Sequence, residues 1–156
     1  MGLFHQQVVG KWNARGTRWR RLRGTSDSSR FMALDAKTGR LRWNFAAKAY
    51  MFSSAALAGD LAYVGDHNGK LYAVDTKTGK LAWEFQAEAS KKDLMRVLNA
   101  DGSLNQEAFS PVFGDFEDMY IDFYRFISIG AILSSPVVDK GVVYFGSMDG
   151  NLYALQ

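Results

Sequence analysis

The sequence predicts an all-β protein built from repeated units of short antiparallel strands. The stretches FMALDAKTGRLRWNF (31–45) and LYAVDTKTGKLAWEF (71–85) follow one pattern at an offset of 40 residues. Residues 52–75 and 133–156 match each other at an offset of 81, about twice 40, and share eight identical positions. Strand-like runs with turns roughly every eight to twelve residues are typical of sandwiches, barrels and propellers. A period near 40 residues with four strands favours the blade of a β-propeller.

Composition excludes several kinds of functional site. The 156 residues contain no cysteine, which rules out a disulfide scaffold, a thiol nucleophile and a cysteine-ligated metal. The two histidines, His5 and His67, are too few for a multi-histidine metal site. No run of about 18 apolar residues predicts a membrane-spanning helix, and the first residues lack the pattern of a signal peptide.

The first 23 residues form a basic segment that we expect to be poorly ordered. Residues 1–30 contain seven Lys/Arg and one acid, whereas the rest contains twelve bases and fifteen acids, so the net charge of +3 comes from this end. The run RWRRLR (18–23) places an aromatic ring among guanidinium groups, which could bind phosphate or acidic lipid. Terminal segments usually stay loose unless tied down, so an arm without a partner is the favoured interpretation, and nucleic acid binding is not expected.

The propeller units are expected over residues 24–86. A partial unit spans about 24–45, and a full unit has strands at 53–57, 61–65, 71–75 and 81–85. The basic stretch that precedes the partial unit does not have the alternation of a strand. The pairs Asn68–Gly69 and Asp149–Gly150 suit two-residue hairpins, in which both residues need positive φ.

Each of the first two units contains the turn Asp-x-Lys-Thr-Gly, followed four residues later by tryptophan. The aspartate carboxylate and threonine hydroxyl can accept hydrogen bonds from backbone N–H groups, and the glycine can adopt the left-handed conformation. The indole can pack over the turn of the adjoining unit and donate its N–H to a backbone carbonyl. We interpret the whole repeat motif as structural. Its residues are Asp35, Thr38, Gly39, Trp43, Asp75, Thr78, Gly79, Trp83, Gly146, Asp149 and Gly150.

Residues 87–130 interrupt the repeat and are expected to form an insert with short helices. Helical spacing of Leu94, Val97 and Leu98 predicts one helix over 91–99. The segment 99–105 is expected to be a turn. Its faint likeness to a calcium loop fails because the first and twelfth ligand positions would be Val97 and Ala108, which offer no side-chain oxygen.

A second helix is expected within 114–130, with Phe116, Tyr120, Phe123 and Ile127 on one face. The insert either covers the propeller or forms a lid that binds a ligand or partner, because loops on one face usually carry the function of a propeller. The candidate partner-binding residues are Phe116, Tyr120, Phe123 and Tyr124. The acids of the same segment could face a cation or a basic partner, although a solvated helix face is the simpler interpretation.

The motif Ala-x-Asp-x-x-Thr-Gly-x-x-x-Trp at 33–43 and 73–83 resembles the PQQ-enzyme repeat, as do Ser-Ser-Pro-Val-Val at 134–138 and the sequence of 143–155. This repeat builds β-propellers in quinoprotein dehydrogenases, in the lipoprotein subunit of the bacterial outer-membrane barrel-assembly machinery and in other exported proteins. The resemblance covers about 24–86 and 131–156. It implies a partial β-propeller of two to three four-stranded blades, with the serine-rich strand innermost and the tryptophan-bearing strand outermost, and a periplasmic or extracellular location.

The last blade, at 131–156, is expected to lack its outer strand. The chain then resembles the C-terminal part of a longer propeller. The ring would be closed either by further blades before this segment or by self-association.

Two classes of function follow from the resemblance. The favoured one is a non-catalytic module that binds a protein, peptide or glycan. The alternative is a fragment of a PQQ-dependent dehydrogenase that oxidises alcohols or sugars, with PQQ and calcium as cofactors. No aspartate matches that family's catalytic base, and His67 is expected to be exposed in a turn and not to act as a base. We therefore assign no catalytic, cofactor-binding or metal-binding residue.

Overall fold

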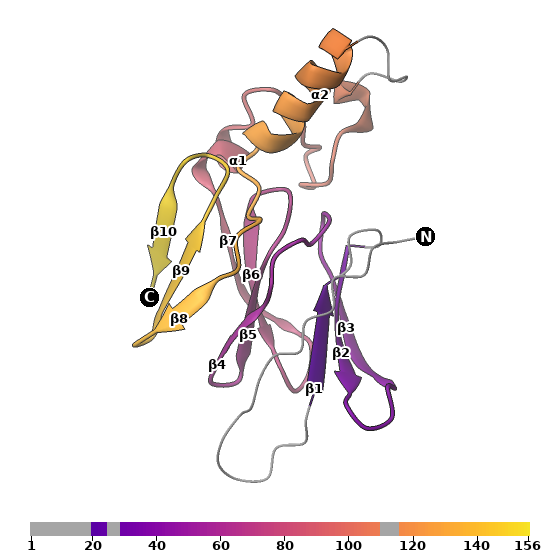
Figure 1. Ribbon diagram of the computed structural model, residues 1–156, viewed down its shortest axis with the longest axis vertical. Coiled ribbons are helices and arrows are strands. Elements are labelled where there is room, and N and C mark those ends of the chain that lie inside the picture. Colours follow the sequence, from indigo (N-terminus) through magenta and orange to yellow (C-terminus); the bar gives the residue numbers. More distant parts are fainter. Residues whose placement is uncertain (1–19, 25–28, 110–115) are drawn as a thin grey trace.

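The computed structural model describes residues 20–24, 29–109 and 116–156. Its strands form three antiparallel sheets, which we call blades A, B and C (Figure 1). Blade A contains β1 (Arg20–Gly24), β2 (Arg30–Asp35) and β3 (Leu41–Ala46). Blade B contains β4 (Ala56–Ala58), β5 (Leu61–Gly65), β6 (Lys70–Asp75) and β7 (Leu81–Gln86). Blade C contains β8 (Val137–Asp139), β9 (Val142–Gly146) and β10 (Leu152–Leu155).

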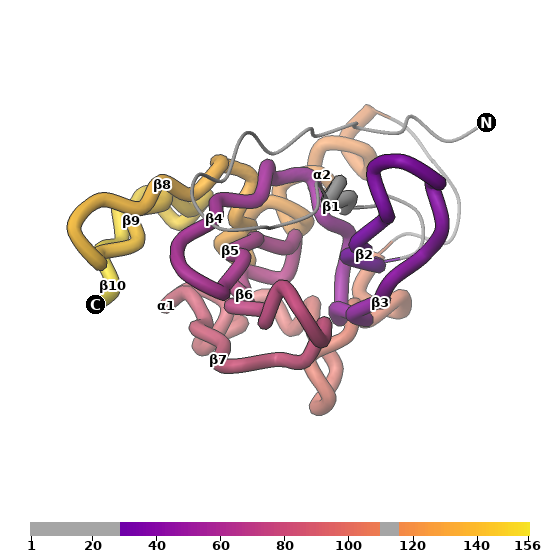
Figure 2. Tube along the Cα trace, turned by 90° about the horizontal axis from the view of Figure 1, so that it is seen from below, coloured from indigo at the N-terminus to yellow at the C-terminus, as the bar shows by residue number. Residues whose placement is uncertain are grey.

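Blade B is the complete unit, with the strand order β4-β5-β6-β7. The short strand β4 is at one edge and the tryptophan-bearing strand β7 is at the other, which is the predicted order. The strand expected at 53–57 instead spans Ala56–Ala58, so the two serines precede it. In the described part of the chain, blade C has the order β10-β9-β8 and no outer strand. Figure 2 shows blade B between the other two blades, so the sheets follow one another in chain order.

Strand β1 differs from the sequence-based expectation. The boundary placed at residue 23 falls inside this strand, which pairs with β2 so that Arg21 is opposite Leu34 and Arg23 is opposite Met32. The basic run does not have the alternating pattern of a strand. Its pairing depends on backbone hydrogen bonds to the edge of β2, which a pattern of side chains does not report. The remainder of the basic segment, residues 1–19, lies outside the described residues.

The turns between the second and third strands also differ from expectation. Only the glycine of each pair has positive φ, 77° at Gly69 and 84° at Gly150, so these are not two-residue hairpins. In blade B the Asp66 N–H donates to the Lys70 carbonyl at 2.8 Å, and the Lys70 N–H donates to Asp66 Oδ1 at 2.9 Å. The Asp66 carboxylate thus closes a longer turn whose residues are buried under the insert.

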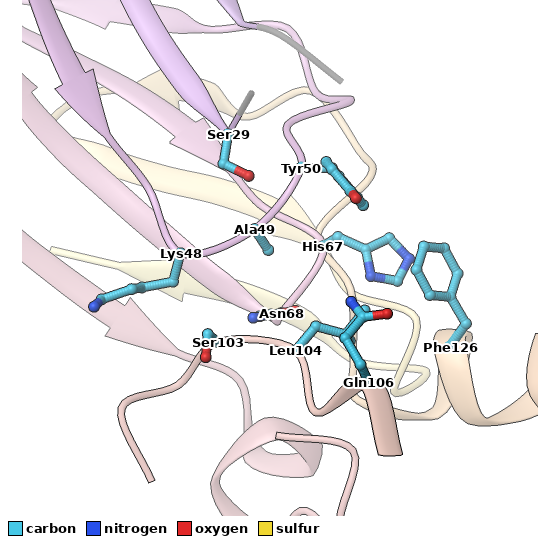
Figure 3. Close-up of a pocket in the computed structure, with 10 residues that line it drawn as sticks. All are labelled: Ser29, Lys48, Ala49, Tyr50, His67, Asn68, Ser103, Leu104, Gln106 and Phe126. Atoms are coloured by element: carbon cyan, nitrogen blue, oxygen red, sulfur yellow. The ribbon is translucent and has the colours of Figure 1, made fainter. Parts of the chain in front are cut away.

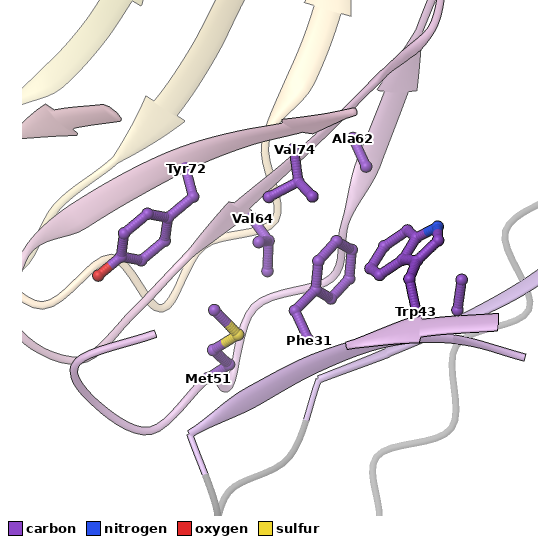
Figure 4. Close-up of a cluster of buried hydrophobic side chains, with 8 residues drawn as sticks. Phe31, Trp43, Met51, Ala62, Val64, Tyr72 and Val74 are labelled. Atoms are coloured by element: carbon purple, nitrogen blue, oxygen red, sulfur yellow. The ribbon is translucent and has the colours of Figure 1, made fainter. Parts of the chain in front are cut away.

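Two cores hold the blades together, one at each interface. Phe31 and Trp43 of blade A pack against Val64 and Tyr72 of blade B (Figure 4). On the other side of blade B, a second cluster joins it to blade C and includes Tyr63, Leu71, Val143 and Phe145. The alternation of side chains along each strand supplies both clusters, because successive residues of β6 point to opposite faces of the sheet.

The insert contains α1 (Glu88–Lys92), the short 3-10 helix η1 (Gln106–Ala108) and α2 (Phe116–Ser128). The helix expected over 91–99 is wrong beyond Lys92. Asp93 adopts a left-handed conformation with φ 39°, and its carboxylate accepts hydrogen bonds from the backbone N–H groups of Val97 and Leu98. Val97 is buried, so its apolar character reflects packing of a loop and not a helix face. No helix within the described ranges is long and apolar enough to cross a membrane.

Candidate functional site

Helix α2 carries a row of large apolar side chains that the rest of the described chain does not cover. Phe116 is 77% exposed, and Tyr120 and Phe123 are each 61% exposed. Met119 and Tyr124 are also exposed. We call these five residues the aromatic surface. A contiguous exposed apolar patch on a soluble domain marks an interaction site more often than a single exposed side chain does.

The C-terminal end of α2 lies next to the blades, and the rest of the helix extends beyond them (Figure 1). Arg125 donates to the Ala108 carbonyl at 2.8 Å, and Phe126 stacks on His67 with ring centroids 3.4 Å apart. Directly after the helix, Ile129 and Ile132 are buried. Asp118 and Asp122 lie on the other side of the helix from Phe116 and Tyr120, whereas Glu117 is seven residues before Tyr124 and borders the aromatic surface. The helix is therefore amphipathic with its apolar side outward.

The sequence identified most of the aromatic surface. Phe116, Tyr120 and Phe123 recur at helical spacing, and Tyr124 adjoins them. It missed Met119, three residues after Phe116, although the same spacing could have identified it. It also did not predict that Phe126 anchors the helix, because the contact with His67 joins residues far apart in the chain.

A pocket of about 330 Å³ lies between the insert and the blades (Figure 3). It is lined by residues that connect blades A and B, by the β5–β6 turn and by the insert. Its lining includes Lys48, Tyr50, His67 and Gln106. None of the ten described residues that line it is a carboxylate, so its chemistry is that of a polar recess and not of an acid–base pair.

The expectation that His67 is exposed is wrong. The side chain is 2% exposed, because α2 and residues 50–52 cover the β5–β6 turn. Among the described residues, the buried Nδ1 atom has no hydrogen-bond partner. Burial lowers the pKa of His67 to about 4, since the charged imidazolium would lose its hydration. The ring is therefore neutral at pH 7 and is a poor proton acceptor.

His67 predicts a pH dependence of stability. In the unfolded chain its pKa is about 6.5, so between pH 6.5 and 4 the unfolded state binds a proton that the folded state does not. The stability contributed by the neutral ring is present above pH 6.5 and is lost as the pH falls toward 4, by up to about 3 kcal/mol. The free energy of unfolding is measured with urea at pH 7.5 and at pH 4.5 in the natural chain and in His67→Gln. Between the two pH values the natural chain should lose more of this free energy than the variant does. Equal losses in both proteins would contradict the assignment.

Asp66, beside His67, has a structural role. Burial raises its pKa to about 6, and a hydrogen bond from the Tyr72 hydroxyl at 2.7 Å only partly offsets this shift. Sequence reasoning missed this pair. The sequence shows only an aspartate six residues before a tyrosine in an apolar strand. That spacing is too common to indicate a buried pair.

The Asp-x-Lys-Thr-Gly turns form the same hydrogen bonds in blades A and B. Asp35 Oδ1 accepts from the Thr38 N–H at 3.0 Å, and Asp75 Oδ1 accepts from the Thr78 N–H at 2.7 Å. Gly39 and Gly79 have φ of 71° and 74°. The Arg42 side chain and the Thr38 backbone hold the pKa of Asp35 well below its usual range.

The two tryptophans occupy corresponding positions in successive blades. Trp43 Nε1 donates to the Thr76 carbonyl at 2.8 Å, in the turn of the next blade, and the ring lies against Gly79. Trp83 lies 5.7 Å from the Tyr63 ring and packs at the interface of blades B and C. In blade C, the Gly146 carbonyl accepts a hydrogen bond from the Ser134 hydroxyl at 2.8 Å. The Asp149 carboxylate accepts a hydrogen bond from the Tyr153 hydroxyl at 2.6 Å.

The described residues do not fit the PQQ–calcium group of quinoprotein dehydrogenases. No three histidine, aspartate or glutamate side chains gather where they could hold a metal ion in the described ranges. Trp43 packs edge-on against Phe31 and donates its N–H within the interface of two blades, so it offers no open platform for a planar cofactor. We derive no catalytic step through this group.

Together, the blade order and the two interblade cores define the class of the protein as a partial β-propeller. A protein-family model described as outer membrane protein assembly factor BamB matches residues 12–108, more than half of the chain. The chain belongs to this family of PQQ-like repeat propellers. No curated protein matches the sequence.

Solved structures support the fold assignment. BamB from Moraxella catarrhalis is similar with a TM-score of 0.54 and 20% identity, over 87% of this chain and 29% of that one. The quinohemoprotein alcohol dehydrogenase from Comamonas testosteroni has a TM-score of 0.50 and 21% identity, over 83% of this chain and 16% of that one. The computationally designed Ika4 protein has a TM-score of 0.54 and 12% identity, over 87% and 59%. The chain thus spans less than a third of the length of the two natural proteins.

Proposed function

We propose that this chain is a non-catalytic propeller module that binds a protein partner through the aromatic surface of α2. The observation that carries the proposal is the exposure of Phe116, Tyr120 and Phe123 on a helix whose C-terminal end is firmly anchored. An amphipathic helix with its apolar side outward is suited to an apolar groove on another protein, in which residues at helical spacing act as anchors. Aromatic side chains are enriched among the residues that dominate binding energy.

The family supports the same class of function. The matched family model is named for an outer membrane protein assembly factor, a name that implies protein partners and a location outside the cytoplasm. We extend both properties to this chain as part of the proposal, with a periplasmic or extracellular location. The quinoprotein neighbour contributes only its fold to the comparison, because its identity with this chain is 21%.

Site-specific photo-crosslinking in cells tests the proposal. A benzophenone amino acid placed at Tyr120 or Phe123 should yield the same discrete protein adduct, because both positions belong to one surface. The matched control is Asp118, which is exposed on the same helix but outside the aromatic surface. Tyr120→Ser should reduce the adduct formed from position 123 at least tenfold. Equal adducts from positions 118 and 123, or none from the aromatic surface, would overturn the proposal.

A reconstitution assay tests the non-catalytic assignment separately. The 156-residue chain is supplied with PQQ and calcium, and dye reduction is measured with alcohols and sugars as substrates. We expect no reduction above that of the cofactor alone, since the described residues supply no metal site. Turnover that depends on the protein would contradict the non-catalytic assignment and would show that the chain is an oxidoreductase.

A further inference from the structure

Two adjacent residues that line the pocket between the insert and the blades each carry a buried polar atom without a hydrogen-bond partner among the described residues. The atoms are His67 Nδ1 and Asn68 Oδ1. The two residues are 2% and 1% exposed. Most buried polar side-chain atoms in folded proteins are paired, because an unpaired one is costly. Two such atoms in one pocket therefore point to a ligand that supplies the missing groups.

Hydrogen bonds hold both side chains in place and leave these two atoms unpaired. Asn68 Nδ2 donates to the Gly102 carbonyl of the insert at 2.6 Å, which fixes the plane of the amide. The His67 backbone N–H donates to the Tyr50 carbonyl at 2.9 Å, and the His67 ring stacks on Phe126. Three segments that are far apart in the chain thus form the pocket: the link before blade B, the β5–β6 turn and the insert.

The charges around the pocket favour an uncharged ligand. Of the ten described residues that line it, only Lys48 is charged at pH 7, since burial keeps His67 neutral. The Lys48 ammonium is 3.7 Å from the Asp101 carboxylate, and Figure 3 shows it pointing away from His67. Among these lining residues an anion would find no cation near His67, and a cation would find no carboxylate to offset the loss of its hydration.

Hydroxyl groups match the two unpaired atoms. Asn68 Oδ1 can only accept a hydrogen bond, whereas His67 Nδ1 accepts in one tautomer of the neutral ring and donates in the other. A hydroxyl serves either tautomer, because it both donates and accepts. Two hydroxyls on adjacent carbons are suited to meet these two adjacent residues.

The rest of the lining suits the carbon skeleton of such a ligand. Figure 3 shows the rings of Tyr50 and Phe126 on either side of His67, and Leu104 adds an aliphatic side chain. Aromatic and apolar walls with a few polar groups are typical of small-molecule sites. The volume of about 330 Å³ is near the lower end of the usual range of about 300–1,000 Å³, so it favours a ligand of one ring.

We propose that this pocket binds a small uncharged polyol ring, such as a cyclitol or a neutral hexose, through two hydroxyls on adjacent carbons. One hydroxyl bonds to His67 Nδ1, the other donates to Asn68 Oδ1, and the C–H face of the ring packs on Tyr50. The exposed Gln106 side chain points toward the His67 ring and moves aside to admit the ligand (Figure 3). The site is separate from the aromatic surface of α2, so it goes beyond the proposed function.

A nuclear magnetic resonance titration of the natural 156-residue chain tests the site. The probes are myo-inositol, glucose and trans-1,2-cyclohexanediol at millimolar concentrations. The diol and at least one of the other two should shift the His67 imidazole and Asn68 side-chain amide resonances until saturation. The tighter of myo-inositol and glucose then identifies the source of the hydroxyls. If neither binds, or if the shifts lie outside the pocket, the proposal is wrong.

Matched diols test the two features that define the ligand. 1,4-Cyclohexanediol has the same composition as the 1,2-isomer, but its hydroxyls are not adjacent, so it should bind at least fivefold more weakly because one hydrogen bond is lost. 3,4-Dihydroxycyclohexanecarboxylate and 3,4-dihydroxycyclohexylamine keep the adjacent hydroxyls and add a negative or a positive charge. Both should also bind at least fivefold more weakly. Equal or tighter binding of any of the three would overturn the proposal.

A variant separates ligand binding from the packing of the turn. His67→Phe keeps an aromatic ring beside Phe126 and removes the unpaired nitrogen, so it should fold at least as stably as the natural chain but bind trans-1,2-cyclohexanediol at least fivefold more weakly. Leu94→Glu, at an 85% exposed position of the insert, should leave the affinity unchanged. Equal affinities of His67→Phe and the natural chain would contradict the proposal. Crosslinking from α2 does not involve the pocket, so either proposal can fail without the other.

Discussion

Replacing Trp43 with alanine should lower the free energy of unfolding by about 3–5 kcal/mol, the usual cost of removing a large buried aromatic side chain. The ring is buried between blades A and B, packs edge-on against Phe31 with centroids 5.6 Å apart, and donates its N–H to the Thr76 carbonyl. Its removal leaves a cavity at the interface that joins the two blades. Guanidinium unfolding followed by circular dichroism measures the loss.

Two variants serve as controls for this prediction. Trp43→Phe keeps an aromatic ring but loses the hydrogen bond, which contributes about 1 kcal/mol, so it should be milder than alanine. Trp83→Ala should also cost less than Trp43→Ala, because the Trp83 ring is only partly buried. A loss at position 83 that equals or exceeds the loss at position 43 would contradict the assigned role of Trp43.

Replacing Gly79 with alanine should be the second strongly destabilising change. Its φ of 74° is costly for a residue with a Cβ, and the added Cβ would lie 2.7 Å from Trp43 Cγ and Cδ2. Gly39 is the matched control, since it occupies the same turn position with φ 71° but has nothing within 4 Å of an added Cβ. We expect Gly39→Ala to cost about 1–2 kcal/mol and Gly79→Ala a further 1–3 kcal/mol from overpacking.

The double variant separates the two contributions at Gly79. Trp43→Ala removes the ring atoms Cγ and Cδ2 but keeps Cβ, which would lie 2.8 Å from the added Cβ of residue 79. Gly79→Ala should therefore cost less in the Trp43→Ala protein than in the natural chain, although still more than Gly39→Ala. Such coupling is expected only for residues in direct contact. Additive losses in thermal or chemical unfolding would show that the clash does not determine the cost.

The blades could be predicted because their signals are local and repeated. In β6 and β7 the apolar alternation, the aspartate that closes the turn and the following tryptophan all lie within a few residues of one another. Their hydrogen bonds, such as Thr78 N–H to Asp75, form within the same short segment. Because the same pattern recurs at an offset of 40, one unit supports the interpretation of the other.

The aromatic surface could be predicted in part for a related reason. Helical spacing of Phe116, Tyr120 and Phe123 predicts one apolar face whatever surrounds the helix. Whether that face is buried or exposed depends on packing, and the sequence left both a covering insert and a binding lid open. The structure places these three side chains in solvent, whereas Phe126 in the last turn of α2 packs on His67.

From its sequence alone, this protein could be assigned to tandem β-blades, since periodicity and turn chemistry are properties of neighbouring residues. The burial of His67 and the pairing of β1 were decided by the tertiary structure. Each depends on partners that do not follow from local pattern: Phe126 covers the imidazole, and β2 supplies an edge for a basic strand. Such contacts form only when the chain is folded, so residue spacing does not record them.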